Sequence, residues 1–112
     1  MLIIKLSIKL MQIDDLKEDC FALLRQIPLG KITTYKIIAE KMNIKSLRLV
    51  GKIIGLNPDI PATPCHRVIK SNGDISGYSN GVKEKIKILQ SEGISVEKNK
   101  VLNYQKFLYK FS

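Results

Sequence analysis

The sequence predicts one mainly α-helical domain that contains a winged-helix-like helix-turn-helix, a small β-hairpin and a short N-terminal strand. Three observations support this fold class. The 112 residues are enough for one hydrophobic core and too few for two domains. Several segments carry apolar residues at helical spacing directly after a capping residue. An Asn-Gly pair at 72–73, between two apolar runs, is a strong hairpin signal.

The short strand is expected within residues 1–13. Apolar and polar residues alternate there with the period of a strand that has one face in water, and the apolar set is Ile4, Leu6, Ile8 and Leu10. The intervening lysines interrupt any apolar run long enough for a signal peptide or a membrane span. We therefore expect no targeting segment.

The first helix is expected between residues 14 and 26. Asp14 or Asp15 can cap its N-terminus. Its apolar residues recur at helical spacing and are expected to face the core: Leu16, Cys20, Leu23, Leu24 and Ile27. Pro28 and Gly30 end the helix.

Two shorter helices follow and form the predicted helix-turn-helix. The first spans about 35–42 behind Thr33 or Thr34 as its cap, and Asn43 is suited to a left-handed helix end. The second spans about 47–55 behind Ser46 as its cap. Two short helices joined by a tight turn, the second with basic residues near its start, indicate a helix-turn-helix.

The second half of the chain is expected to hold the hairpin, a fourth helix and a closing hairpin. The first hairpin pairs residues 68–70 with Ile75 around the turn at 71–74. The fourth helix starts at Val82 and buries Ile86 and Leu89, and Gly93 ends it. Three lysines are placed on its solvent face: Lys83, Lys85 and Lys87. A hairpin turning at 97–100 and a short helix at 103–109 close the chain.

The stretch 60–69 carries the candidate chemistry, because it sets Cys65 beside His66, the sole histidine. Pro61 and Pro64 hold the approach extended. One interpretation is a buried thiol next to a structural histidine. The other is a nucleophile with a base, since a catalytic thiol needs a base or a positive charge nearby to become a thiolate. Glu92, in the last turn of the fourth helix, faces the negative end of the helix dipole, and it is the candidate for orienting the imidazole.

Composition narrows the function classes. A net charge of +9 indicates a polyanionic partner, first of all nucleic acid, although an anionic membrane would also fit the sign. Two cysteines in separate contexts are expected to be free thiols of an intracellular protein. Two cysteines and one histidine lack the paired spacing of a metal site, so no metal is expected. A cysteine protease is disfavoured, because its cysteine and histidine lie far apart in sequence.

The motif Pro64-Cys65-His66-Arg67-Val68 resembles the active-site motif of the O6-alkylguanine-DNA alkyltransferases, or methylated-DNA–protein-cysteine methyltransferases. Other segments are similar to motifs of this family in the same order. Residues 27–35 resemble the start of its helix-turn-helix, and 47–51 with 57–58 resemble its recognition helix and the turn that follows. Residues 77–93 resemble its pocket loop and the next helix. The resemblance covers about residues 14–110.

The resemblance implies a DNA-repair protein that transfers an alkyl group, such as methyl, from guanine O6 in double-stranded DNA to its own cysteine, once per molecule and without a cofactor. The alkylated base must be flipped out of the duplex. A monomer with no membrane partner is implied, in the cytoplasm or, in a eukaryote, the nucleus. Residues 14–112 would be the DNA-binding and catalytic domain. Residues 1–13 would be a remnant of the N-terminal domain that the family usually has.

The resemblance also implies roles for five residues around the reaction. Cys65 would accept the alkyl group, His66 would deprotonate it through a water, and Glu92 would orient His66. Tyr35 would donate a proton to the departing guanine. Asn57 would tie the turn between the recognition helix and the active-site strand.

Five residues would hold the DNA and the base. By resemblance the recognition helix enters the minor groove, and Arg48 inserts where the flipped base was. Tyr78 would wall the pocket, and the backbone amide of Ser79 would reach O6. The carbonyls of Cys65 and Val68 would accept hydrogen bonds from the exocyclic amine of the base.

The chain departs from the family pattern at several positions. Leu47 and Leu49 replace the small alanines that flank the arginine of the recognition helix. Ser76 and Asn80 stand at loop positions where glycine is usual. These changes leave the approach to DNA and the size of the accepted alkyl group open.

Two other functions fit parts of the pattern. The non-catalytic alkyltransferase-like proteins bind the same lesions with the same fold, but they lack the cysteine, which is present here as Cys65. A helix-turn-helix transcription regulator would leave Tyr35, Glu92 and the Cys65-His66 pair without roles.

Overall fold

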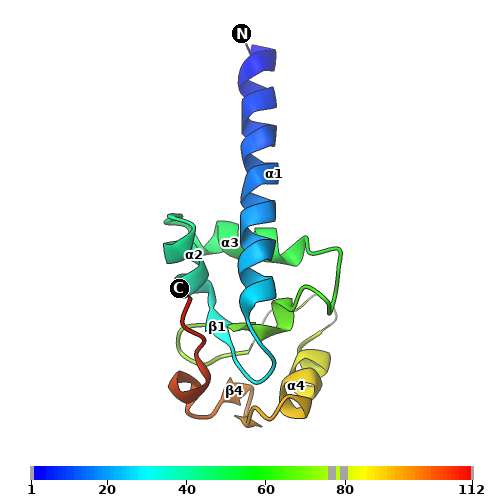
Figure 1. Cartoon of the computed structure of the whole chain (residues 1–112), viewed down its shortest axis with the longest axis vertical. Helices are drawn as coiled ribbons and strands as arrows, with labels where there is room; N and C mark the ends of the chain where they lie inside the picture. Colours follow the sequence, from blue (N-terminus) through cyan, green and yellow to red (C-terminus); the bar gives the residue numbers. More distant parts are fainter. Residues whose placement is uncertain (1, 76–77, 79–80, 112) are drawn as a thin grey trace.

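The computed structural model describes residues 2–75, 78 and 81–111, and of residues 2–13 it describes the backbone. Within these residues the fold is mainly helical, with small strands between the helices (Figure 1). The elements in chain order are α1 (Leu2–Gln26), β1 (Thr33–Thr34), α2 (Tyr35–Lys41), α3 (Leu47–Gly55), the 3-10 helix η1 (Cys65–Arg67), β2 (Val68–Ile69), α4 (Val82–Ser91), β3 (Val96–Glu97), β4 (Lys100–Val101) and the 3-10 helix η2 (Tyr104–Phe107).

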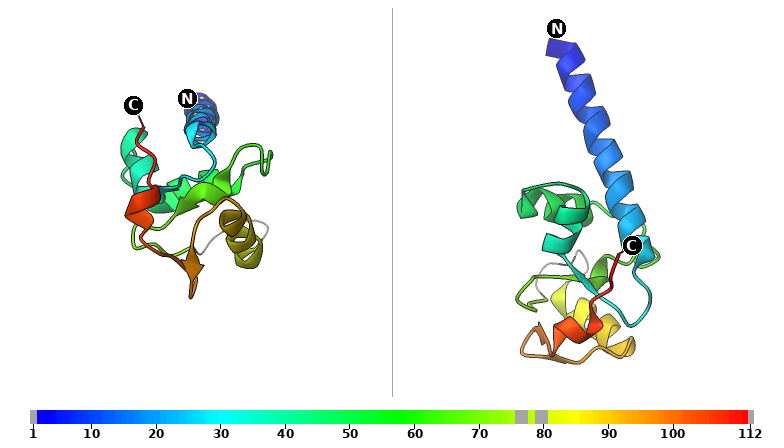
Figure 2. Two further views of the ribbon diagram at one scale, coloured as in Figure 1. Left: turned by 60° about the horizontal axis from the view of Figure 1, so that its bottom comes forward. Right: turned by 60° about the vertical axis from the view of Figure 1, so that its left-hand side comes forward.

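The long helix α1 corrects the predicted N-terminal strand. Residues 4–10 are helical, and α1 projects from the rest of the molecule (Figures 1 and 2). A strand needs a neighbouring strand for its backbone hydrogen bonds, whereas a helix makes them within the segment. No glycine or proline interrupts residues 2–26, so Asp14 and Asp15 lie inside the helix instead of capping it. Its end at Gln26, before Pro28 and Gly30, confirms the prediction. Among the described residues, no helix is long and apolar enough to cross a membrane.

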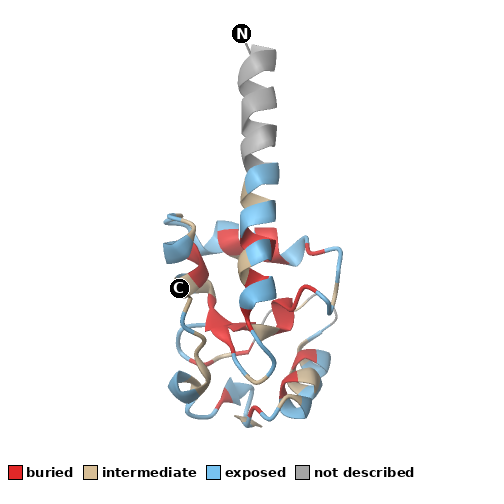
Figure 3. Ribbon diagram, in the orientation of Figure 1, coloured by how far each residue is buried: buried red, intermediate tan, exposed pale blue. Residues whose placement is uncertain are grey.

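The main core lies where the C-terminal half of α1 meets α2 and α3, as the buried positions in Figure 3 show. Cys20 and Leu24 of α1 are fully buried and pack in one cluster with Ile38 of α2 and Val50 of α3. Cys20 is therefore a core residue, as expected. Packing of these apolar faces, more than the local preference of each segment, stabilises the short helices.

The helix-turn-helix forms as predicted. Thr34 caps α2, since the Ile37 amide donates to its hydroxyl oxygen at 3.1 Å. Ser46 caps α3 in the same way, with the Leu49 amide donating at 3.1 Å. Asn43 has a φ of 57° in the turn between the two helices, which is the left-handed conformation expected for it. These local hydrogen bonds set where each helix starts.

The strands pair differently from the prediction at one of the two hairpins. A turn forms at 71–73, where the Lys70 amide donates to the Asp74 carbonyl at 2.9 Å. However, β2 pairs in parallel with β1, and the Ile75 amide donates to the Asn99 carbonyl at 3.0 Å. Both residues of β2 are buried, which suits a parallel pair covered on two faces and not a hairpin with one wet face. The closing hairpin is confirmed as the antiparallel pair β3 and β4.

Helix α4 has one side chain on a different face from the prediction. Lys83 and Lys87 are exposed, but Lys85 is fully buried. Lys85 lies three residues after Val82 and four before Leu89, so it shares the helix face that packs on the second core cluster. The helix ends as predicted, with Gly93 at a φ of 87° directly after Glu92.

Candidate active site

Cys65 begins the 3-10 turn η1, directly after Pro64 and before β2. The extended approach predicted from the prolines is wrong, because residues 60–62 form a turn in which the Thr63 amide donates to the Asp59 carbonyl at 2.7 Å, and Cys65 and His66 lie in the 3-10 turn that follows. The Cys65 amide donates to the Thr63 carbonyl at 2.9 Å. The side chain is 4% exposed and lines a cavity. Its thiol is free, as is that of Cys20, whose pKa burial raises to about 12. Cys20 is therefore an inert core thiol at neutral pH.

Asn57 stabilises the turn that precedes Cys65 through side-chain hydrogen bonds. Its Nδ2 donates to the Thr63 carbonyl at 2.8 Å, and its Oδ1 accepts from the Asp59 amide at 2.9 Å. Because Asn57 is buried, these hydrogen bonds are shielded from competing water. The amide thus connects the end of α3 to the residues just before η1, where the resemblance placed it.

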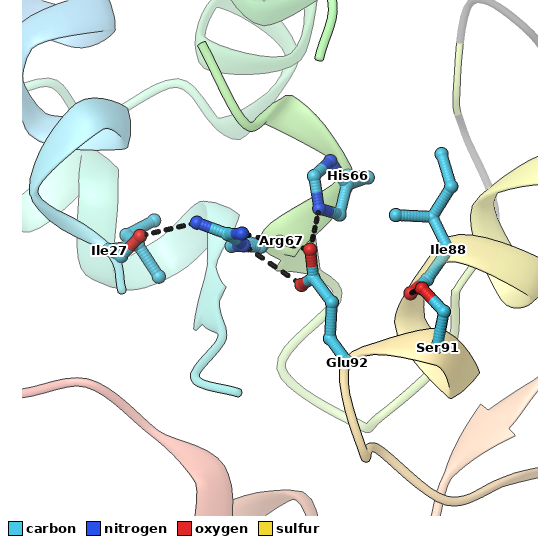
Figure 4. Close-up of polar contacts among 6 residues, drawn as sticks. All are labelled: Ile27, His66, Arg67, Ile88, Ser91 and Glu92. Atoms are coloured by element: carbon cyan, nitrogen blue, oxygen red, sulfur yellow. Dashed lines mark hydrogen bonds and ion pairs between the residues drawn. The ribbon is translucent and has the colours of Figure 1, made fainter. Parts of the chain in front are cut away.

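His66, Arg67 and Glu92 form a partly buried hydrogen-bonded cluster (Figure 4). Nε2 of His66 lies 3.0 Å from Oε2 of Glu92. Arg67 grips the same carboxylate with two donors, Nε to Oε1 at 2.9 Å and Nη2 to Oε2 at 2.8 Å, while its Nη1 donates to the Ile27 carbonyl at 2.7 Å. Glu92 thus obtains the donors that its position at the end of α4 requires. No role was predicted for Arg67, although a carboxylate at the negative end of a helix dipole signals a nearby cation or hydrogen-bond donor.

The protonation states in this cluster follow from burial and charge. Burial raises the pKa of Glu92, but hydrogen bonds from Arg67 and His66 outweigh burial, and the pKa is lowered. A carboxylate accepts hydrogen bonds only, so Nε2 of His66 carries the proton that it donates. Burial lowers the pKa of His66 despite the opposing effect of Glu92, so the imidazole is neutral at pH 7. Its buried Nδ1, which has no hydrogen-bond partner among the described residues, therefore holds a lone pair that can accept a proton.

Two tyrosines stand on the cavity walls with Cys65. Tyr35 is the first residue of α2, and Tyr78 meets the His66 ring edge-on at 6.5 Å between centroids. Burial raises the pKa of both tyrosines, and a negative charge on Cys65 would raise their pKa values further. Both phenols therefore keep their protons at neutral pH. The buried hydroxyl of Tyr78 has no hydrogen-bond partner within the described part of the chain.

The cavity has a volume of about 690 Å³, within the range of pockets that hold small organic molecules. Its walls come from the start of α2, the face of α3 and the turn after β2, and they include Tyr35, Lys36, Leu47, Arg48, Gly51, Ile54, Gly55, Lys70, Ser71 and Asn72. Leu47 and Arg48 are exposed to solvent as well as to the cavity. The helix-turn-helix and the reactive cysteine therefore share one cavity.

Lys85 is a second charged group beside this site. Its Nζ donates to the Val68 carbonyl at 2.6 Å and lies 6.0 Å from the centroid of the Tyr35 ring. Burial lowers the pKa of Lys85 to about 8, although the charges of Cys65 and Asp74 favour the protonated form. The sequence analysis missed this residue because it read the lysines of α4 as one solvent face. The helical spacing to Val82 and Leu89 is the signal that could have found it.

The structure brings most of the predicted site residues together. Cys65, Tyr35, Tyr78 and Arg48 line one cavity, and Glu92 holds His66 beside it. The backbone carbonyl of Val68 accepts from Lys85. Ser79 lies outside the described residues, as do Ser76 and Asn80. Within the described residues, no group of three or more His, Cys, Asp or Glu side chains could hold a metal ion.

This arrangement can support nucleophilic attack by sulfur. It places a thiol at a cavity, a neutral imidazole beside it that is fixed by a carboxylate, and two phenols on the cavity walls. The same combination of nucleophile, base and orienting acid underlies catalytic triads, and a wall donor can stabilise charge on a leaving group.

Comparisons with known proteins agree with one another. A family model described as 6-O-methylguanine DNA methyltransferase, DNA binding domain, matches residues 15–94. A methylated-DNA–protein-cysteine methyltransferase of Saccharolobus islandicus is 48% identical over 71 residues, which are 63% of this chain and 46% of the relative. A bifunctional methyltransferase/endonuclease of Picrophilus torridus is 38% identical over 92 residues, covering 81% of this chain and 31% of the relative. The chain thus spans about a third to a half of the length of these curated relatives.

Solved structures give the same fold. S. pombe Atl1 in complex with damaged DNA containing O6-carboxymethylguanine superposes with a TM-score of 0.77 at 28% identity, covering 87% of this chain and 96% of that one. Mycobacterium tuberculosis OGT in complex with DNA gives a TM-score of 0.67 at 34% identity, covering 70% and 49%. Both solved structures contain DNA.

Proposed function

The chain belongs to the 6-O-methylguanine DNA methyltransferase family, which acts in DNA repair, and from this premise we propose that it transfers a methyl or other alkyl group from guanine O6 in double-stranded DNA to Cys65. Each molecule reacts once, because the thioether product cannot return the thiol. The observation that carries this proposal is the cavity that Cys65 shares with Tyr35 and Arg48, next to a neutral imidazole held by Glu92.

The chemical step follows from the groups at the cavity. His66, with its proton on Nε2, takes the proton of Cys65 on Nδ1 through a bridging water, and Glu92 stabilises the imidazolium that forms. The thiolate attacks the alkyl carbon, an S–C bond forms, and the C–O6 bond breaks with its electron pair going to the guanine. Tyr35 donates its phenol proton to the purine, so the leaving group departs without a full negative charge. The products are restored guanine and an S-alkyl cysteine.

DNA binding brings the base to this cavity. The recognition helix α3 enters the minor groove, and Arg48 fills the place of the flipped base, whose extrusion costs a few kcal/mol. Tyr78 walls the base, the Ser79 amide reaches O6, and the carbonyls of Cys65 and Val68 accept from the exocyclic amine. The net charge of +9 supplies attraction to phosphates.

Residues 14–112 would serve as the DNA-binding and catalytic domain and would act as a monomer. Residues 2–13, where a strand was expected, form the first half of α1.

A second candidate is a non-catalytic lesion binder, which the similarity to Atl1 over 96% of that chain favours. Intact-mass measurement after incubation with a duplex that contains O6-methylguanine separates the two functions. The proposal expects one methyl group added at Cys65 and no addition in Cys65→Ala. A wild-type protein that binds the methylated duplex tightly and gains no mass would establish the lesion binder instead.

A further inference from the structure

Leu47 is an exposed leucine at the rim of the cavity that holds Cys65. It is 48% exposed and lines this cavity together with Arg48, its neighbour in the first turn of α3. Single apolar residues on a protein surface are common and need no explanation. Leu47 differs from the other exposed leucines of the described residues, which do not line the cavity: Leu29, Leu49, Leu56 and Leu102.

Leu47 lies on a ridge between two hollows of the surface. The first hollow is the cavity with Cys65, and the second, of about 500 Å³, lies between the end of α2 and the start of α3. Leu47 and Lys36 line both hollows, so they form the boundary that the hollows share. A nucleotide that enters the cavity from the side of α3 must pass over this boundary.

The row of α3 that begins with Leu47 carries no other side chain. Gly51 and Gly55 follow Leu47 at intervals of four residues, and both line the cavity. A Cβ built at either glycine would meet no neighbouring segment within 4 Å in the described part of the chain. The row therefore presents bare backbone along its later turns and one exposed leucine at its first turn.

The start of α3 holds this leucine in a fixed place. The Leu49 amide donates to Oγ of Ser46 at 3.1 Å, which caps the helix directly before Leu47. Farther along the helix, Val50 and Ile53 are buried in the main core. A side chain can separate stacked bases only if its backbone is held rigidly, and the cap and the buried residues supply this support.

We propose that Leu47 is a second wedge beside Arg48, which inserts its apolar side chain into the minor groove next to the alkylated guanine and promotes flipping of that base. This role rests on the proposed function, because it takes the cavity as the site of the flipped base. Proteins that bind the minor groove frequently insert leucine or similar apolar side chains between base steps. The exposed leucine leaves water when it enters the stack, and this burial offsets part of the cost of unstacking.

The first test measures unstacking without reaction, in proteins that carry Cys65→Ala. The probe is a duplex with 2-aminopurine directly beside O6-methylguanine, because the fluorescence of 2-aminopurine rises when it loses its stacking. At saturating protein we expect a smaller rise with Leu47→Ala than with Leu47. Leu47→Met keeps an apolar side chain of similar volume and should restore the rise. Leu56→Ala removes an exposed leucine outside the cavity and should leave the rise unchanged.

The second test measures single-turnover transfer by proteins that retain Cys65. Transfer from the duplex should slow about fivefold in Leu47→Ala, the factor expected when roughly half a leucine side chain is no longer buried on binding. Transfer from the free base O6-methylguanine needs no flipping and should keep its wild-type rate. Alanine favours a helix at least as well as leucine, so the variant should unfold at the same urea concentration as the wild type or a higher one.

Three results would overturn the proposal: no fluorescence rise with Leu47, an equal rise with Leu47→Ala, or faster transfer from the duplex by Leu47→Ala. Faster transfer would mean that the leucine holds α3 away from the groove. Failure of the proposed function gives a different result, in which the wild type gains no methyl group. A protein that gains none, but whose fluorescence rise depends on Leu47, would be a lesion binder that keeps the wedge.

Discussion

Hydrogen bonds and an ion pair stabilise the charged side chains around η1. Arg67 and His66 share the carboxylate of Glu92, and the Nζ of Lys85 donates to the Val68 carbonyl. Each ionised group here has a partner of opposite charge or a strong acceptor, as buried charges require.

The free energy of unfolding should depend on pH because the folded protein buries the side chain of Lys85. The pKa of Lys85 is about 8 in the folded protein and about 10.5 in the unfolded chain, so the unfolded state binds more protons between these values. The free energy of unfolding should thus rise from pH 8 to pH 10.5 by roughly 3 kcal/mol from this residue, at about 1.36 kcal/mol per unit. Urea denaturation of the wild type and of Lys85→Met across this range gives the difference. If the two curves ran parallel, the lysine would not be buried in its charged form.

At the scale of elements, short segments are placed by a few polar side chains at their ends. Thr34 and Ser46 start α2 and α3, and Asn57 fixes the path from α3 to η1. Tyr35 follows the Thr34 cap directly, so the start of α2 also places a phenol on the cavity wall. The caps therefore determine where α2 and α3 begin and, at the start of α2, where Tyr35 lies in the site.

Removing the side-chain amide at Asn57 should loosen the turn that carries Cys65. In Asn57→Ala the Thr63 carbonyl loses one of its two donors and the Asp59 amide loses its acceptor, which should lower the free energy of unfolding by about 1–3 kcal/mol. Alkyl transfer should slow as well, because Cys65 follows Thr63 by two residues and shares its backbone hydrogen bond. Chemical denaturation and single-turnover rates measure the two effects. A fall in stability with an unchanged transfer rate would limit Asn57 to a structural role.

The whole molecule measures 52 × 27 × 21 Å, and its length comes largely from α1, which projects beyond the helical core (Figure 2). The reactive cavity opens between the helix-turn-helix and the turn after β2, so the face that would meet DNA is the face that holds the sulfur. The net charge of +9 attracts polyanions, and salt screens this attraction.

Two contributions to DNA recognition should separate by their salt dependence. Binding to an undamaged duplex should weaken steeply as salt rises, because phosphate contacts release counterions. Arg48→Ala should lower the slope by at most about one ion, yet slow methyl transfer from duplex DNA at least tenfold if Arg48 holds the base out of the stack. Transfer from the free base O6-methylguanine needs no flipping and should keep its wild-type rate. A parallel loss with the free base would place Arg48 in the chemistry instead.

Local signals in the sequence were enough for the helix-turn-helix, the end of α1 and the Cys65-His66 motif, because a cap, a helix-ending glycine and a motif depend on neighbours within a few residues. The helical start of α1 was missed for another local reason, since a helix makes its backbone hydrogen bonds within the segment, whereas the expected strand would need a neighbour. Tertiary structure alone decided the parallel pairing of β1 with β2, the two hydrogen bonds from Arg67 to Glu92 and the hydrogen bond from Lys85 to the Val68 carbonyl. Each of these depends on segments distant in sequence, because a strand needs a partner and a buried charge needs an acceptor or counter-charge that the chain supplies only once folded.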